Sequence, residues 1–234
     1  MVCRSLTSRP PPIARLAVSL AEYAKRFAAT PGKFLDDARA APAQYHNGLT
    51  VAKTFALAID EAAKLHPAAE PLIVYAALLA PEPIPLYLFS EGREKFGEPL
   101  FSALADDGLD EAVAALLAFA LVDRETIPDE REPAIGTDCI RLHRLVRQVA
   151  AVRREGELGA NPTRALIAAL AEVYPENVMY NPSTWPRARR LDALAIGLVA
   201  GDTPPPDGAE IAVGYLLNQL SSYRQIALAA YAQA

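Results

Sequence analysis

The chain has 234 residues, of which 52% are hydrophobic and 22% charged, and its formal net charge is −5. This composition is typical of a globular protein with a core of its own, and the acidic balance gives no general attraction for nucleic acid or anionic membranes. The longest apolar runs are about half of the roughly 20 residues that cross a bilayer, which predicts no membrane segment. The two cysteines, Cys3 and Cys139, are far apart and predict neither a disulfide framework nor a metal site, so we expect a reducing, cytoplasmic location.

Helical periodicity begins in the first quarter of the chain. Ser19 and Glu22 form a capping box at an amphipathic helix that stops before Pro31. Residues 1–18 are therefore predicted to be a disordered or atypical lead-in without the apolar stretch of a signal peptide. Residues 19–49 are predicted to be a helical linker segment.

Two stronger helices are predicted next. Thr50 is placed to cap the first of them, whose apolar side chains recur at helical spacing until a His-Pro pair ends it. These side chains are Val51, Phe55, Ala58, Ala62 and Leu65. The second helix, PLIVYAALLA from Pro71, is apolar nearly all round and is expected at the centre of the core. Three closely spaced prolines end it, and short helical turns are expected over residues 86–89 and 96–104.

A helix, a hairpin and another helix come after these turns. Asp110 is expected to cap a helix over residues 111–120, after which the sequence FALV changes to a strand pattern. A charged, proline-containing loop leads to a second strand, 139–142, and then to a helix that starts at His143. Short helices followed by a hairpin and a helix are typical of a winged-helix domain whose hairpin is the wing. We place this domain at residues 50–154.

The rest of the chain is also predicted to be helical. Residues 155–160 are typical of a linker, and residues 161–200 of two linker helices, the second beginning near Ser183. A stiff proline-rich segment, 201–208, precedes an apolar helix at residues 209–234. Because a helical repeat needs a neighbour to cover its inner face, the abrupt apolar end indicates a truncated first repeat of an α-solenoid.

Three segments resemble, in order and spacing, the winged-helix region of bacterial NB-ARC-type (STAND) signal-transducing ATPases. They are TVAKTFALAIDEAAKLHPAAEPLIVYAALLAPEPIPLYLF, LLAFALVDRE and IRLHRLVRQVA. SLAEYAKRFAATPGKFLDD resembles the helical segment before that region, STWPRARRLDALA the linker helices after it, and YLLNQLSSYRQIALAAYAQA the first tetratricopeptide (TPR) repeat. The resemblance covers residues 19–234. It implies a mainly α fold, with a winged helix and short β-hairpin wing leading into a TPR-like arm.

The resemblance also implies a role for His143. In that family a histidine at the start of the last winged-helix helix contacts the β-phosphate of ADP and holds the closed, inactive state. His143 matches this position, and Arg147 would assist it at the phosphate. The following residue is aspartate in plant members and Arg144 here, which puts the geometry of this contact in question.

The nucleotide itself would be held elsewhere. The sequence has no GxxxxGK[ST] motif and too few residues ahead of residue 19 for a nucleotide-binding domain. ADP or ATP would therefore be part of a complete assembly, with the nucleotide-binding domain supplied in cis or in trans. The repeat arm would bind a protein partner and couple it to the ADP-bound closed state.

Two other interpretations stay open. A winged helix also suggests a DNA-binding transcriptional regulator that uses Arg144, Arg147 and Arg154. Against it, DDGLDEAVAALLAFA, the helix before the wing, has four acidic residues and no basic one, which repels phosphates. The third interpretation is a non-functional gene fragment with exposed apolar surface.

Neither a catalytic nor a metal site is predicted. The sequence has no GxSxG motif, and neither cysteine has a histidine partner in its neighbourhood. His46, His66 and His143 occur at no spacing that metal ligands use. We therefore expect a regulatory and protein-interaction module without enzymatic activity.

Overall fold

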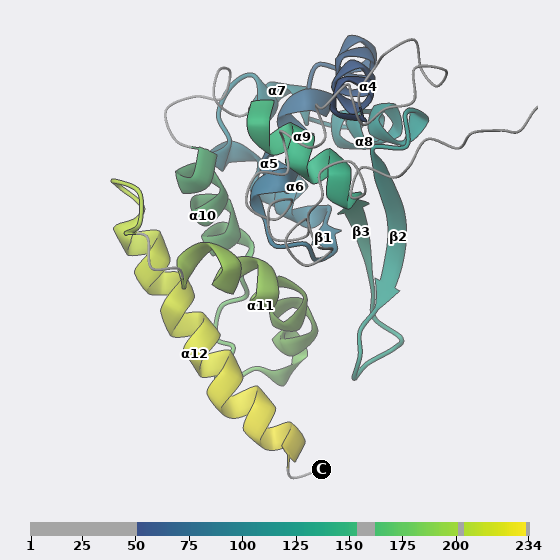
Figure 1. Ribbon diagram of the computed structural model, residues 1–234. Coiled ribbons are helices and arrows are strands. Elements are labelled where there is room, and N and C mark those ends of the chain that lie inside the picture. Colours follow the sequence, from purple (N-terminus) through teal and green to yellow (C-terminus); the bar gives the residue numbers. More distant parts are fainter. Residues whose placement is uncertain (1–50, 154–161, 201–203, 233–234) are drawn as a thin grey trace, which may run out of the picture. The chain divides into compact units, whose positions relative to one another are not determined.

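The computed structural model describes residues 51–153, 162–200 and 204–232 (Figure 1). From Phe55 onward the chain forms one compact unit, which is mainly helical and contains one small antiparallel sheet. The predictions for residues 1–50, including the Ser19 capping box, lie outside the described residues.

Helices α4 (Val51–Leu65) and α5 (Ala69–Leu78) confirm the first two predicted core helices. As its apolar sequence predicts, α5 is buried along most of its length. The buried face of α4 agrees with the predicted one only in part. Ala62 is fully buried as predicted, but Ile59, outside the predicted set, is also fully buried, and Leu65 is exposed. The helix ends at Leu65, where the chain turns toward α5.

Three strands form the sheet in the order β1-β3-β2, and both pairings are antiparallel. The strands are β1 (Ile84–Pro85), β2 (Val122–Pro128) and β3 (Gly136–Leu142). Ile140 in the central strand lies opposite Ile84 of β1, and both side chains are fully buried. The edge position suits β1, because a proline has no N–H to donate to a second neighbour.

The hairpin is longer than the sequence predicts. Most of the predicted charged loop is strand, since DRETIP continues β2 to Pro128 and β3 begins at Gly136. Its charged side chains are satisfied across the two strands. For example, Arg141 Nε donates to Glu125 Oε1 at 2.8 Å. The connecting turn therefore covers only residues 129–135.

Short helices connect β1 to the hairpin. Helix α6 (Tyr87–Glu91) confirms the first predicted turn. The second is shorter than predicted, as α7 (Leu100–Ala103), and an additional 3₁₀ turn, η2 (Arg93–Lys95), precedes it. Helix α8 (Gly108–Ala118) starts before the predicted cap, so the Asp110 assignment is wrong. Asp110 lies instead in the first turn, where a carboxylate interacts favourably with the helix dipole.

The helices after the hairpin lie close to their predicted positions. Helix α9 (Arg144–Arg153) packs against α5, and α10 (Pro162–Val173) against α6. The 3₁₀ turn η3 (Pro182–Thr184) precedes α11 (Trp185–Val199), and α12 (Glu210–Ala232) comes last. Apolar side chains buried among α10, α11 and α12 include Leu166, Leu170, Val173, Leu191, Leu194, Leu216, Leu220 and Tyr223.

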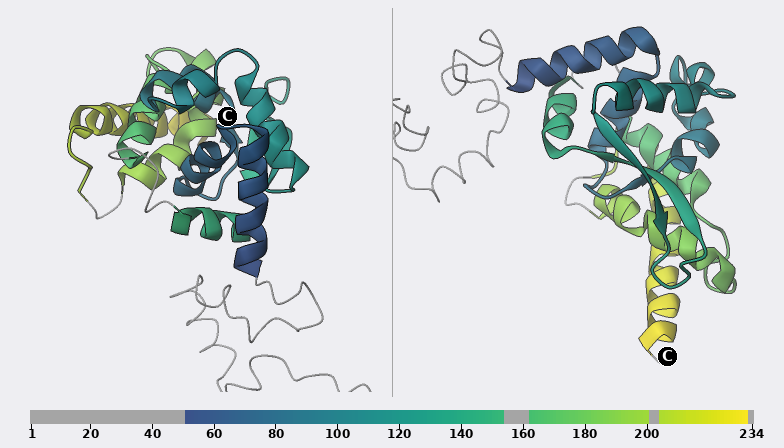
Figure 2. Two further views of the ribbon diagram at one scale, coloured as in Figure 1. Left: turned by 90° about the horizontal axis from the view of Figure 1, so that it is seen from above. Right: turned by 90° about the vertical axis from the view of Figure 1, so that its right-hand side faces the viewer.

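The turn of the hairpin reaches α11, and α12 packs against α10 and α11. In Figures 1 and 2, β2 and β3 run from beside α8 to α11, and α12 lies along α10 and α11. We call α11 and α12 together the helical arm. Over the described parts of the chain, no helix combines the length and the apolar character needed to span a membrane.

Candidate functional site

His143 lies between the last residue of β3 and the first residue of α9. Its side chain is exposed, and its backbone carbonyl accepts the N–H of Arg147 at 3.0 Å in the first helical hydrogen bond. The ring stacks on Phe55 of α4, with 6.2 Å between ring centroids. His143 is exposed on the polar side as predicted, but it lies one residue ahead of α9 and is not part of the helix.

The hydrogen bonding of the His143 ring distinguishes its two nitrogens. Nδ1 accepts the backbone N–H of Leu145 at 3.3 Å, which satisfies one of the unpaired donors at the start of α9. A neutral imidazole that accepts through Nδ1 carries its proton on Nε2. The exposed Nε2–H is therefore a donor that can reach a ligand outside the helix.

Arg147 does not share the exposed surface with His143, contrary to the predicted helical face. Its half-buried guanidinium donates through Nη1 to the carbonyls of Ala76 at 3.0 Å and Ala77 at 3.2 Å, and also to that of Leu79. These carbonyls lie at the C-terminal end of α5, where a cation satisfies unpaired acceptors and the helix dipole. Burial lowers the pKa of Arg147 from its usual value.

Of the three arginines predicted on this face, Arg144 is the one that lies at the surface with His143. Its side chain is exposed at the first position of α9. Arg154 lies outside the described residues. The structure thus brings together a histidine, an arginine and the N-terminus of a helix, and it places Arg147 underneath them as a tether between α9 and α5.

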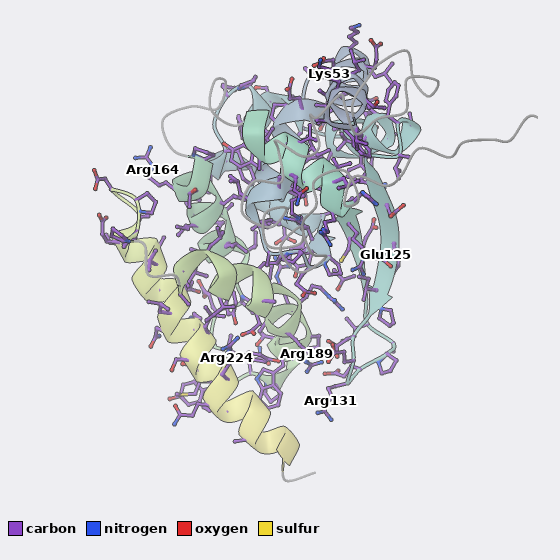
Figure 3. The ribbon with its side chains drawn as sticks, in the orientation of Figure 1. Lys53, Glu125, Arg131, Arg164, Arg189 and Arg224 are labelled. Atoms are coloured by element: carbon purple, nitrogen blue, oxygen red, sulfur yellow. The ribbon has the colours of Figure 1, made fainter. Side chains whose placement is uncertain are left out.

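A second polar site joins the hairpin turn to the helical arm. Asp129, only 5% exposed, accepts the N–H groups of Arg131 at 3.0 Å and Glu132 at 2.9 Å through Oδ1. The same oxygen accepts Nη1 of Arg189 in α11, and Arg189 Nε lies 3.3 Å from the Tyr223 hydroxyl oxygen in α12. Figure 3 shows Arg189 between α11 and the turn that carries Arg131. We call the Asp129, Arg189 and Tyr223 group the clasp.

Opposing effects set the pKa of Asp129. Burial alone would raise the pKa, because a carboxylate loses its hydration. The hydrogen bonds from the N–H groups of Arg131 and Glu132, together with the charge and hydrogen bond of Arg189, outweigh it and lower the pKa. The carboxylate is therefore ionised in the folded protein at neutral pH.

Arg187 ties α11 to two other helices. Its Nε donates to the carbonyl of Val173 in α10 at 2.9 Å, and its Nη1 donates to Glu91 of α6 at 3.1 Å. The guanidinium carbon lies 4.0 Å from the centroid of the Tyr87 ring, a cation–π arrangement. Successive arginines of α11 therefore face different neighbours, because Arg190 Nη2 also donates to the Pro128 carbonyl of the hairpin at 3.3 Å.

The surface of the hairpin and α8 is unfavourable to nucleic acid. Arg124 of β2 pairs with Asp110 of α8 at 2.7 Å and with Asp138 of β3 at 2.6 Å, and Arg141 pairs with Glu125. These arginines are neutralised within the protein. Glu111 of α8 is exposed and adds negative charge to this surface.

The remaining histidine and cysteine of the described part have structural surroundings. His66 Nδ1 accepts the N–H of Ala68 at 3.2 Å ahead of α5, and Nε2 lies 3.7 Å from Glu111. Burial raises the pKa of the Cys139 thiol to about 11, which keeps it protonated and unreactive. Within the described residues, no three His, Cys, Asp or Glu side chains gather as metal ligands would. His46 lies outside this part.

Sequence reasoning missed Asp129, Arg187 and Arg189 as structural connectors. A signal was present for Arg187, which precedes buried Leu191 by four residues and buried Leu194 by seven, so that it lies on the inward face of α11. Asp129 offered only the weaker signal of a carboxylate at the start of a turn. Its partner in α11 is 60 residues away, and no local pattern reveals that pairing.

Comparisons of the chain with protein-family models, with curated proteins and with solved structures give no significant match.

Proposed function

We propose that the chain is a non-catalytic regulatory and protein-interaction module of a cytoplasmic NB-ARC-type (STAND) signal-transducing ATPase. In this proposal residues 50–154 are a winged helix, and the helices after it lead into a TPR-like arm. The module biases a nucleotide-binding domain, supplied in cis or in trans, toward its ADP-bound closed state. The exposed position of His143 just before α9, with its Nδ1 accepting the Leu145 N–H, is the observation on which the proposal rests.

The order and pairing of the elements support a winged helix. Helix α5, strand β1, helices α6 and α8, and the β2–β3 hairpin occur in this order along the chain. The first strand joins the far side of the hairpin, giving the order β1-β3-β2. A three-stranded sheet of this connectivity, with helices before and after the hairpin, supports this part of the proposal.

The surroundings of His143 suit a phosphate contact. Its Nδ1 is used by the Leu145 N–H, which fixes the ring and directs the Nε2–H away from the helix. The N-terminus of a helix has a positive electrostatic potential that favours anions, and exposed Arg144 adds a charge beside it. Arg147 acts indirectly in this proposal, by holding α9 on α5.

The mechanism is a shift of a conformational equilibrium. The contact from His143 to ADP stabilises the closed arrangement only because the contact is absent in the open one. A partner bound to the arm shifts the same equilibrium through the different contacts that it makes in the two states.

The proposal is tested by measuring ADP dissociation. The chain is fused to the nucleotide-binding domain of an NB-ARC-type ATPase whose own winged helix has been removed, and release of a fluorescent ADP is followed. We expect His143→Ala to accelerate release about tenfold to a hundredfold, the effect of losing a hydrogen bond to a charged group. An unchanged dissociation rate would contradict the contact.

A second variant separates the phosphate contact from the helix cap. His143→Asn keeps a side-chain acceptor for the Leu145 N–H but cannot extend a donor as far as an imidazole. We expect it to release ADP as fast as His143→Ala does. Release at the wild-type rate would show that His143 acts only as a cap, and Lys64→Ala, which removes an exposed charge of α4, is the matched control for a change of surface charge.

DNA binding is the rival function that the same architecture suggests. The paired arginines and the acidic start of α8 oppose it, because they leave little positive charge to displace counterions. We expect no shift of duplex DNA by the isolated chain at low salt. A shift that disappears when the exposed Arg144 is neutralised would favour the regulator, whereas an aggregating product would favour a gene fragment.

A further inference from the structure

The buried carboxylate of Asp129 points to a conformational role for the hairpin. Within the described residues it is the only charged side chain that is buried, and Arg189, which pairs with it, is 15% exposed. The two residues belong to elements far apart in the sequence. A buried charge that loses its partner costs free energy, because it stays desolvated and unpaired. The turn and α11 are therefore expected either to stay together or to separate completely.

We propose that the clasp holds the β2–β3 turn against the helical arm. Local opening of the turn and of α12 is then coupled, so that loss of the clasp increases the opening of both segments. This inference goes beyond the proposed function and does not depend on a nucleotide. It assigns the hairpin an intramolecular partner, the helical arm, in place of an external one.

The turn is built to present the Asp129 carboxylate. Its Oδ1 accepts two N–H groups from the turn, and the Asp129 N–H donates to the Ile135 carbonyl at 2.8 Å, which closes the turn on itself. A turn organised in this way keeps its carboxylate in place before α11 arrives. Arg189 therefore meets a preformed acceptor.

The arm side of the clasp reaches two helices. Arg189 contacts Asp129 with one nitrogen and lies within hydrogen-bond distance of the Tyr223 hydroxyl of α12 with another, and Tyr223 is buried. Arg190 adds a hydrogen bond to the carbonyl of Pro128. These bonds between the hairpin turn and the arm are polar.

The clasp is tested by hydrogen–deuterium exchange of the full chain, read by mass spectrometry in the turn (residues 129–135) and in the middle of α12 (residues 216–224). Asp129→Asn keeps an oxygen for the turn N–H groups and removes the charge that pairs with Arg189. We expect exchange to accelerate by about tenfold or more in both segments, the factor for a lost charge-assisted hydrogen bond.

A double-mutant cycle isolates the pair. Arg189→Met removes the other partner and should have the same effect on both segments, and the double variant should exchange no faster than either single variant. Glu125→Gln is the matched control, because it breaks an exposed pair of the same hairpin far from the turn. We expect Glu125→Gln to leave both segments within about twofold of wild type.

Two outcomes would overturn the clasp. Faster exchange in the turn with unchanged exchange in α12 would show that Asp129 serves only its own turn. Effects of the two single variants that multiply in the double variant would show that the residues act independently. If Asp129→Asn does not fold, Arg189→Lys, which keeps the charge but loses the planar fork, gives the same two readouts.

Discussion

Arg147 shows how a single side chain departs from its helical face. A projection of α9 places it with His143 on the polar side, and its charge predicts a solvated position. The long stem of an arginine can follow an apolar surface while its head reaches a polar group, and here that group is the end of α5. The sequence does not reveal this alternative position, because the acceptors are backbone carbonyls about 70 residues earlier.

Removing the Arg147 charge should destabilise the fold. Arg147→Met keeps most of the stem but leaves the α5 carbonyls without their donor. We expect the free energy of unfolding to fall by about 1.5–3 kcal/mol, as for a lost hydrogen bond to a charged group. Urea denaturation followed by circular dichroism measures it. Arg144→Met, one turn away and exposed, should change stability by less than about 0.5 kcal/mol, and equal losses in the two variants would contradict the tether.

At the scale of secondary structure, apolar periodicity predicts the helices better than the strands. Helices α4, α5, α9, α10 and α11 repeat apolar residues on a face that tertiary packing then buries. The sequence predicts a loop over most of β2, because four of the six residues of DRETIP are polar and one of the others is proline. Pairing with β3 stabilises this strand, and its charges pair with residues that no local window contains. Strand β1 has no sequence signal because it has two residues and one is proline.

The packing of α6 against α10 depends on a glycine that ends α6. A Cβ atom at Gly92 would lie 2.9 Å from the Cβ of Ala169 and 2.5 Å from the carbonyl oxygen of Leu88. We expect Gly92→Ala to lower the unfolding free energy by about 1–3 kcal/mol, since α10 and the preceding turn must both shift. Adding Ala169→Gly to the Gly92→Ala variant should recover only the part of the lost stability that comes from the clash with Ala169, and not the part that comes from the Leu88 carbonyl oxygen. An unchanged thermal unfolding midpoint for Gly92→Ala would contradict the close packing of α6 and α10 at this glycine.

At the scale of the whole molecule, the described helices and sheet assemble into one unit that contains both His143 and the arm. The resemblance predicts a histidine at the start of α9, and the structure adds the orientation of its ring. The attachment of the hairpin to the arm could not be predicted, because it joins residues 60 positions apart through one carboxylate. Sequence patterns therefore predict the individual helices and strands, whereas contacts between elements that are distant in the sequence are seen only in the three-dimensional structure.

The isolated chain should not hold a nucleotide by itself. The sequence has no phosphate-binding GxxxxGK[ST] loop, and a single histidine contact cannot supply the affinity of a complete site. We expect isothermal titration calorimetry with ADP or Mg-ATP to detect no binding at micromolar concentrations. Tight binding by the chain alone would show that it contains a nucleotide site of its own. This result would contradict the proposal that a separate nucleotide-binding domain holds the nucleotide.

Strand β3 has a fixed length and a fixed register, and its two ends lie next to the two polar sites. Gly136 at one end pairs with Pro128 beside Asp129, and Leu142 at the other end precedes His143. Six steps of about 3.4 Å separate these ends by roughly 20 Å. A slip of one residue would turn buried Ile140 and Leu142 to the opposite face, so the strand cannot slide against its partners. Any movement that preserves the sheet therefore displaces both ends together, and the start of α9 and the hairpin turn cannot change position independently.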